Sequence, residues 1–138
     1  MVQCPIATSL GSLGRKWTLT ILRDIAWAPG CSFSAILKSN PGLRQRTLSM
    51  RLRQLNAEGL VRRELAEGRR RTRYRLTSKG KEVWPILASL LQYGVRNYSR
   101  AVFADGRPRD IEDVFPDNAE LMLGHLGQFA RQSTARRS

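Results

Sequence analysis

Apolar residues recur at helical spacing along most of the first hundred positions. The periodicity predicts helices over about 6–13, 15–27, 35–39, 45–58 and 78–98. Ser34 is the candidate N-cap of the helix over 35–39, and Thr77 is the candidate N-cap of the helix over 78–98. Pro85 lies inside this last helix and should kink it, because proline donates no backbone N–H.

Two short runs of strand character lie between the last two helices. Residues 60–65 and 72–76 flank Glu67-Gly68-Arg69-Arg70, which is typical of a β-hairpin. Asn40-Pro41-Gly42 is a turn between two of the preceding helices. Two helices joined by such a turn and followed by a hairpin form a winged helix–turn–helix, so we expect a mainly α fold with a small β-hairpin.

The chain beyond about residue 100 has its own apolar pattern. Ile111, Val114 and Phe115 precede Pro116, and residues 121–129 predict an extra C-terminal helix. This helix would cover the helices through which two copies of the chain pair, or it would border a pocket for a small effector molecule. We therefore expect a DNA-binding and dimerisation domain over 1–98, and a helical extension with a flexible end over 99–138.

Charge narrows the class of partner. The 138 residues carry 24 Lys+Arg against 11 Asp+Glu, a formal net charge of +13. Residues 44–75 hold eleven arginines, three glutamates and no lysine. Such a window indicates a polyanion surface, in particular double-stranded DNA, although a merely solvated face is the alternative. No amphipathic helix pairs a basic face with an aromatic one, and no apolar run is long enough for a membrane span, so we expect no membrane partner.

The helix over 45–58 is the predicted reading helix. Leu48, Leu52 and Leu55 share its inner side, and its first turns and outer face would meet DNA. Met50 either touches a thymine methyl or packs, and Arg51 lies nearer the inner face, where we expect it to brace the fold. Glutamine pairs well with adenine and arginine with guanine, each worth about 1–3 kcal/mol of discrimination. Base or phosphate contacts are expected from Gln45, Arg46, Thr47, Ser49 and Met50, and a phosphate contact from Arg53.

The hairpin is the second predicted contact with DNA. Arg69, Arg70 and Arg71 at its tip, with Arg73 beside them, would reach the flanking minor groove, whose negative potential attracts arginine. The alternative is that these charges are solvated and only increase solubility.

Several motifs in one order resemble the HxlR-type winged helix–turn–helix transcriptional regulators, relatives of the MarR group. The resemblance covers about 4–98, and Arg15 and the Glu-Gly-Arg-Arg-Arg wing tip depart from the family pattern. It implies a homodimer in the cytoplasm, associated with the nucleoid when it binds palindromic operators. In some members the opening cysteine senses oxidants, quinones or aldehydes. The motifs are Cys4-Pro5-Ile6, Gly14-Arg15-Lys16-Trp17, Ile21-Leu22-Arg23-Asp24, Phe33-Ser34, Pro41-Gly42, the run 48–55, Gly59-Leu60-Val61 and the run 74–80.

A dimer also follows from the size of the reading unit. Two copies spaced by about 34 Å match one turn of DNA, whereas one helix–turn–helix buries little surface. The last long helix has more apolar positions than a small core uses, so some should meet a second copy unless all pack within one chain. The interface candidates are Ile6, Leu10, Leu87, Leu90, Leu91 and Tyr98.

The chain has only two cysteines and one histidine. Cys4 precedes a helix whose dipole favours thiolate, so it is either a sensor of an oxidant or other small effector, or a passive thiol. Cys31 is expected to be a bystander, with a Cys4–Cys31 disulfide across a dimer as the alternative. His125 and two distant cysteines make no zinc pattern.

No grouping of catalytic residues or glycine-rich phosphate loop is found in the sequence, so we expect no enzyme and no cofactor. The leading hypothesis is a sequence-specific dimeric regulator. The alternatives are an architectural chromosome-binding protein, and an effector- or partner-binding module that has lost DNA recognition.

Overall fold

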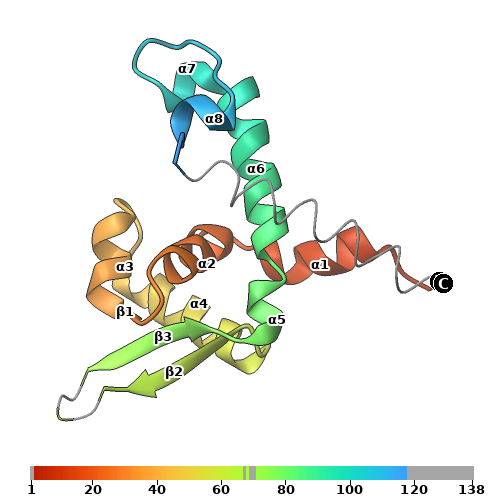
Figure 1. The fold of residues 1–138 in the computed structure, drawn as a ribbon. Coiled ribbons are helices and arrows are strands. Elements are labelled where there is room, and N and C mark those ends of the chain that lie inside the picture. The colour runs from red at the N-terminus through yellow and green to blue at the C-terminus, as the bar shows by residue number, and fades with distance from the viewer. Residues whose placement is uncertain (1, 67, 69–70, 118–138) are drawn as a thin grey trace. The chain divides into compact units, whose positions relative to one another are not determined.

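The computed structural model describes residues 2–66, 68 and 71–117. The contacts divide the chain into two compact units, Met1–Val83 and Trp84–Ser138. The predicted fold class, mainly helical with a small antiparallel sheet, is confirmed (Figure 1). The predicted helix over 121–129 lies outside the described residues, and the domain boundary near 98 stays a prediction. The elements are α1 (Pro5–Leu13), α2 (Thr18–Trp27), β1 (Cys31–Ser32), α3 (Phe33–Ser39), α4 (Gln45–Ala57), β2 (Val61–Leu65), β3 (Thr72–Leu76), α5 (Ser78–Lys81), α6 (Trp84–Asn97), α7 (Ser99–Val102) and α8 (Ile111–Val114).

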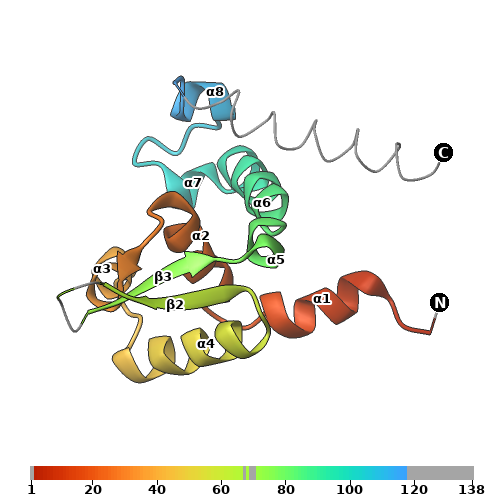
Figure 2. The same ribbon diagram turned by 60° about the horizontal axis from the view of Figure 1, so that its bottom comes forward.

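The core of the first unit forms where α2, α3 and α4 meet the sheet (Figure 2). Their apolar residues follow the helical spacing of the sequence, so one side of each helix is buried. This packing holds α3, the turn and α4 as a helix–turn–helix against the hairpin. The buried side chains include Ile21, Leu22, Ile25, Ile36, Leu48, Leu52, Leu55, Val61 and Tyr74.

The sheet has the strand order β1-β3-β2, with both pairs antiparallel. The predicted hairpin is confirmed, with Val61 opposite Leu76 and Leu65 opposite Thr72. β1 was not predicted, because two residues are too few to show an alternating pattern; it pairs Cys31 with Tyr74.

The helix predicted over 78–98 is wrong as a single element. Thr77 caps α5 as expected, accepting a hydrogen bond from the Gly80 amide at 3.0 Å. The chain then breaks, and Pro85 is the second residue of α6. Proline fits the first turn of a helix, where its missing N–H would have no partner, so it begins a new helix instead of kinking a long one.

Two other helix starts differ from the prediction. The cap of α3 is Ser32, whose hydroxyl accepts from the Ala35 amide at 3.2 Å, and not Ser34. α2 begins at Thr18 instead of residue 15, because Trp17 has a left-handed φ of 74° that ends any continuous helix before it.

The second unit has a small core around Val95 and Ile111. Leu91, Phe103 and Phe115 are among the partly buried side chains packed against this pair. Arg96 pairs with Asp110 at 2.7 Å, and the Arg109 guanidinium lies 4.2 Å from the centre of the Phe103 ring. No helix in the described ranges has the length and apolar character needed to cross a lipid bilayer.

Candidate DNA interface

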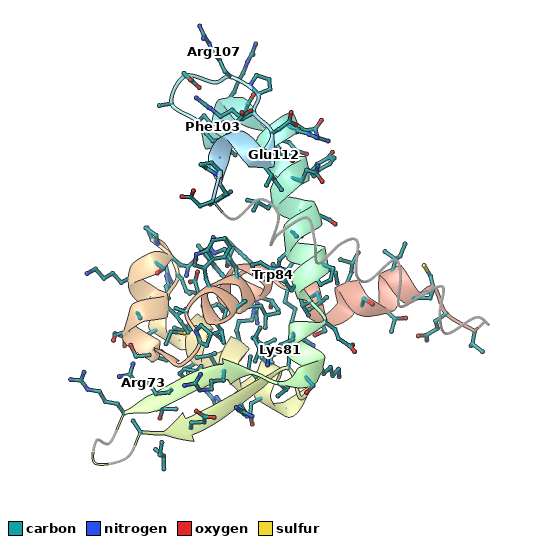
Figure 3. All side chains as sticks on the ribbon, in the orientation of Figure 1. Arg73, Lys81, Trp84, Phe103, Arg107 and Glu112 are labelled. Atoms are coloured by element: carbon teal, nitrogen blue, oxygen red, sulfur yellow. The ribbon has the colours of Figure 1, made fainter. Side chains whose placement is uncertain are left out.

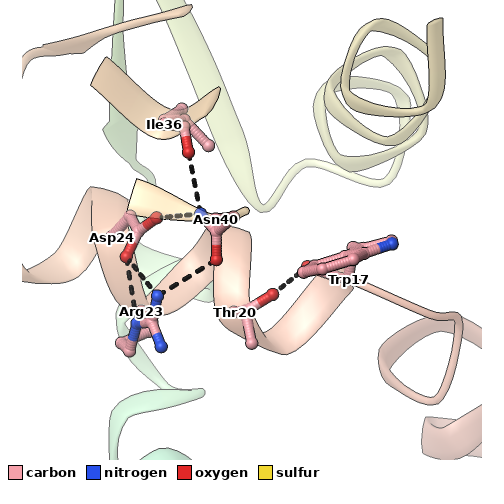
Figure 4. Close-up of polar contacts among 6 residues, drawn as sticks. All are labelled: Trp17, Thr20, Arg23, Asp24, Ile36 and Asn40. Carbon is pink, nitrogen blue, oxygen red and sulfur yellow. Dashed lines mark hydrogen bonds and ion pairs between the residues drawn. The ribbon is translucent and has the colours of Figure 1, made fainter. Parts of the chain in front are cut away.

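A polar network around the buried Asn40 fixes the turn that leads into α4 (Figure 4). Asn40 donates its side-chain amide to the Ile36 carbonyl at 2.8 Å and to the Asp24 carboxylate. Its side-chain oxygen accepts from Arg23 at 3.2 Å, and Arg23 also binds Asp24 at 2.8 Å. Since the buried Asn40 is satisfied by Asp24 and Arg23 of α2 and by the Ile36 carbonyl of α3, the network holds α2, α3 and the turn in one arrangement.

Gly42 gives the turn its shape. Its φ of +93° is a conformation that other residues rarely adopt, and a Cβ there would lie 3.9 Å from the indole of Trp17. The next residue, Leu43, is buried. The start of α4 is therefore set by the backbone and by packing, because its N-cap Arg44 makes no side-chain capping bond.

The two faces of α4 lie as the sequence predicted. Leu48, Leu52 and Leu55 are buried. Arg46, Met50 and Arg53 are exposed on the other side, with Gln45 exposed at the start and Thr47 and Ser49 half-buried. Within the described part of the chain, the Arg46 and Arg53 guanidinium groups form no ion pair or hydrogen bond. The outer face of α4 thus presents cations with no internal partner.

Arg51 braces the fold, as expected. Its Nε donates to the Lys16 carbonyl at 2.9 Å, and its Nη1 donates to Gln54 at 3.1 Å. Arg51 therefore ties the middle of α4 to the segment that joins α1 and α2.

The wing formed by β2 and β3 uses several of its arginines internally. Glu64 accepts Arg75 at 2.8 Å and Arg62 at 3.0 Å. Arg73, which Figure 3 shows on β3, donates to the Gly30 carbonyl at 3.3 Å. Arg63 and Arg71 are exposed, whereas Arg69 and Arg70 lie outside the described residues. Some of the wing's charge thus holds the wing in shape, whereas Arg63 and Arg71 face solvent.

Two acidic residues after position 104 have partners within the second unit, where Asp105 pairs with Arg109 and Asp110 with Arg96. A hydrogen bond from Arg109 lowers the pKa of Asp105. These carboxylates are matched by cations of their own unit, whereas α4 and the wing share the first unit.

Glu58, at the C-cap of α4, is a contact point that the sequence did not reveal. Its carboxylate accepts the Ser12 hydroxyl and, at 2.8 Å, the Arg15 guanidinium. The Lys79 ammonium binds its backbone carbonyl at 2.8 Å. The Ser12 hydrogen bond and the Arg15 charge lower the pKa of Glu58, so this side chain is ionised at neutral pH.

The two cysteines lie in different surroundings. Cys4 is exposed at the N-cap of α1, and the first cations that follow it in the sequence include Arg15, which pairs with Glu58, and Arg23, which pairs with Asp24. Cys31 is half-buried, and burial together with the Asp24 charge raises the pKa of its thiol. A raised pKa lowers the thiolate fraction, which favours Cys31 as a bystander.

The interface candidates divide by exposure. Ile6 and Leu10 on α1 are 72% and 55% exposed, and α6 leaves Leu90 exposed, as is Tyr98 just beyond it. Leu87 and Leu91 are half-buried, and Leu91 packs onto the Val95–Ile111 core of its own chain.

Comparisons with known proteins point to one family. The HxlR-like helix-turn-helix model matches residues 12–102. An uncharacterized HTH-type transcriptional regulator of Synechocystis sp. is 33% identical over 92 residues, which are 66% of this chain and 67% of that protein. A possible HxlR family transcriptional factor of Thermoplasma volcanium has a similar solved structure, with 35% identity, a TM-score of 0.57 and coverage of 66% of this chain and 82% of that one. The reduced form of the redox regulator HypR aligns at 27% identity and a TM-score of 0.61, covering 66% and 90% of the two chains.

Proposed function

This chain belongs to the HxlR-like helix-turn-helix family, and we propose that it is a homodimeric, sequence-specific regulator that reads a palindromic operator. Membership makes it a transcriptional regulator of helix–turn–helix type whose partner is DNA. The observation that carries the finer proposal is the outer face of α4, where Gln45, Arg46 and Arg53 are exposed and Arg46 and Arg53 have no partner among the described residues. Unpaired arginines beside a basic wing suit phosphates and guanine edges.

In this proposal α4 enters the major groove and the wing follows the backbone. Gln45 and Arg46 read bases, Thr47, Ser49 and Met50 flank them, and Arg53 binds phosphate. Arg69, Arg70 and Arg71 serve the flanking groove, and so does Arg73 through the part of its guanidinium that does not bind the Gly30 carbonyl. A second copy is needed because α1 exposes Ile6 and Leu10, and a two-fold dimer doubles the DNA surface.

Selection of binding sites from random duplexes tests sequence specificity. A selected palindrome should bind about a thousandfold or more tightly than random duplex at one salt concentration. Gln45→Ala should change the preferred base at one position of each half-site, because it removes a base contact. Arg71→Ala is the matched comparison: it should weaken all sequences alike. A ratio near one would instead favour an architectural chromosome-binding protein.

The exposed Cys4, together with the similarity to a redox regulator, supports a second proposal: Cys4 senses an oxidant. Diamide should release the parent protein from its operator in gel shifts. It takes two electrons and two protons from the Cys4 thiols of the two copies and joins them in a disulfide, which disturbs α1, the helix proposed to pair with the second copy. Cys4→Ser should stay bound, and Cys31→Ser should respond like the parent. Release of Cys4→Ser by the same diamide concentration would contradict this role.

A further inference from the structure

The helix α1 is weakly held by packing. None of its residues is buried. Figures 1 and 2 both show it extending away from α3 and α4 as an arm. Its apolar side chains Ile6 and Leu10 face solvent and Leu13 is only half-buried, so they contribute little to fixing its direction. The direction of α1 therefore depends on polar contacts at its C-terminal end.

Those contacts converge on the C-terminal end of α4, the predicted reading helix. Ser12, in the last turn of α1, and Arg15, just after it, both donate to the Glu58 carboxylate at the C-cap of α4. The same residue is fixed from the other side, because Lys79 binds its carbonyl at 2.8 Å. A second tie runs from Arg51 to the Lys16 carbonyl.

We propose that Glu58 is a positioning residue that sets the direction of α1 relative to α4, and thereby sets the operator half-site spacing that the dimer accepts. This inference rests on the proposed function, in which α1 pairs with a second copy. The carboxylate joins the helix that would meet the partner to the helix that would read DNA, so it links dimer geometry to recognition geometry.

The helix α1 is long enough for a small rotation to change the spacing between the two reading helices. A nine-residue helix spans about 13 Å. Rotation of such an arm by about 15° moves its far end by about 3.4 Å, the rise of one base step along a DNA strand. A loosened joint would therefore let the two recognition helices fit sites that differ by one base pair.

The test is a series of palindromes whose half-sites are separated by increasing numbers of base pairs. The parent should prefer one spacer about tenfold over its neighbours, whereas Glu58→Ala should discriminate only about twofold. Glu82→Ala is the matched control: it removes an equal charge from an exposed side chain of the first unit that forms no ion pair with the described residues. A single half-site should bind Glu58→Ala and Glu82→Ala equally.

Removing the two donors to Glu58, instead of Glu58 itself, separates the effect of the direction of α1 from the effect of net charge. The double variant Ser12→Ala/Arg15→Ala removes a positive charge instead of a negative one, and it should relax spacer preference in the same way. Glu58→Gln keeps an acceptor oxygen and should recover part of the preference. A structural defect alone would not relax the spacer preference while leaving half-site affinity intact.

Hydrogen exchange measures the joint without DNA. The amides of α1 should exchange faster in Glu58→Ala than in Glu82→Ala, with α2 and α3 unchanged. Spacer discrimination in Glu58→Ala equal to that of Glu82→Ala would overturn the inference. If the parent itself shows no spacer preference, the palindromic proposal fails, and unchanged α1 exchange would then overturn the joint as well.

Discussion

Replacing Gly80 by alanine should destabilise the folded protein by about 2–4 kcal/mol. Gly80 is buried in α5, and a Cβ there would lie 2.0 Å from the Leu60 carbonyl oxygen. The atom in the way is backbone and is itself engaged, because the Leu60 carbonyl accepts the Thr77 amide at 3.1 Å. Relief of the clash would therefore separate α5 from the start of the wing.

Urea unfolding followed by circular dichroism measures this change through the midpoint of the transition. Gly11→Ala is the control, since Gly11 lies inside α1 with nothing within 4 Å of the added carbon. Alanine there should leave stability unchanged or raise it by up to about 1 kcal/mol, the difference in helix propensity. A Gly80→Ala midpoint that matches the parent would contradict the close approach to Leu60.

Local patterns predicted most of the fold because the interactions that form it are local. The spacing of Leu48, Leu52 and Leu55 is enough to place α4 and its inner face. Thr77 was recognised as a cap from its position alone. The predicted kink at Pro85 is wrong, because the sequence shows that a proline interrupts a helix but not whether the helix bends or a new one begins.

Contacts between distant positions could not be predicted in the same way. Glu58 meets Ser12 and Arg15 across 46 and 43 residues of sequence. Nothing in the periodicity near Glu58 distinguishes it from an ordinary solvated glutamate at a helix end. The tight approach of Gly80 to Leu60 has the same origin, because it depends on how α5 docks on the base of the wing.

The candidate DNA interface could likewise be predicted where it depends on local pattern, and not where it depends on distant contacts. The helical wheel places Arg46 and Arg53 on the outer face of α4, and the structure agrees. The window of arginines was interpreted as one surface, yet Arg62 and Arg75 share Glu64, and Arg73 binds the Gly30 carbonyl. Because those pairings depend on the register of the hairpin and on the unpredicted strand β1, charge counting alone could not separate the structural arginines from the free ones.

Arg46→Ala should cause the largest loss of operator affinity of any single substitution on α4. A bidentate arginine contact is worth about 1–3 kcal/mol, and a dimer loses two of them, so affinity should fall by about 30-fold to 10⁴-fold. Stability should change by less than about 0.5 kcal/mol, because Arg46 is exposed and has no internal partner among the described residues. A large loss of operator affinity without a matching loss of stability would identify Arg46 as a binding residue.

Fluorescence anisotropy with a labelled operator over a range of salt concentrations measures the loss and its origin. If Arg46 reads a base, the ratio of operator to random-duplex affinity falls and the salt dependence stays nearly constant. If it binds phosphate, both affinities fall together and the salt slope decreases by about one unit for each protomer. Arg107→Ala removes the same charge from an exposed position of the second unit and should leave operator affinity nearly unchanged, because Arg107 belongs to neither α4 nor the wing. A loss for Arg46→Ala no larger than that for Arg107→Ala would mean that α4 does not meet DNA with this face.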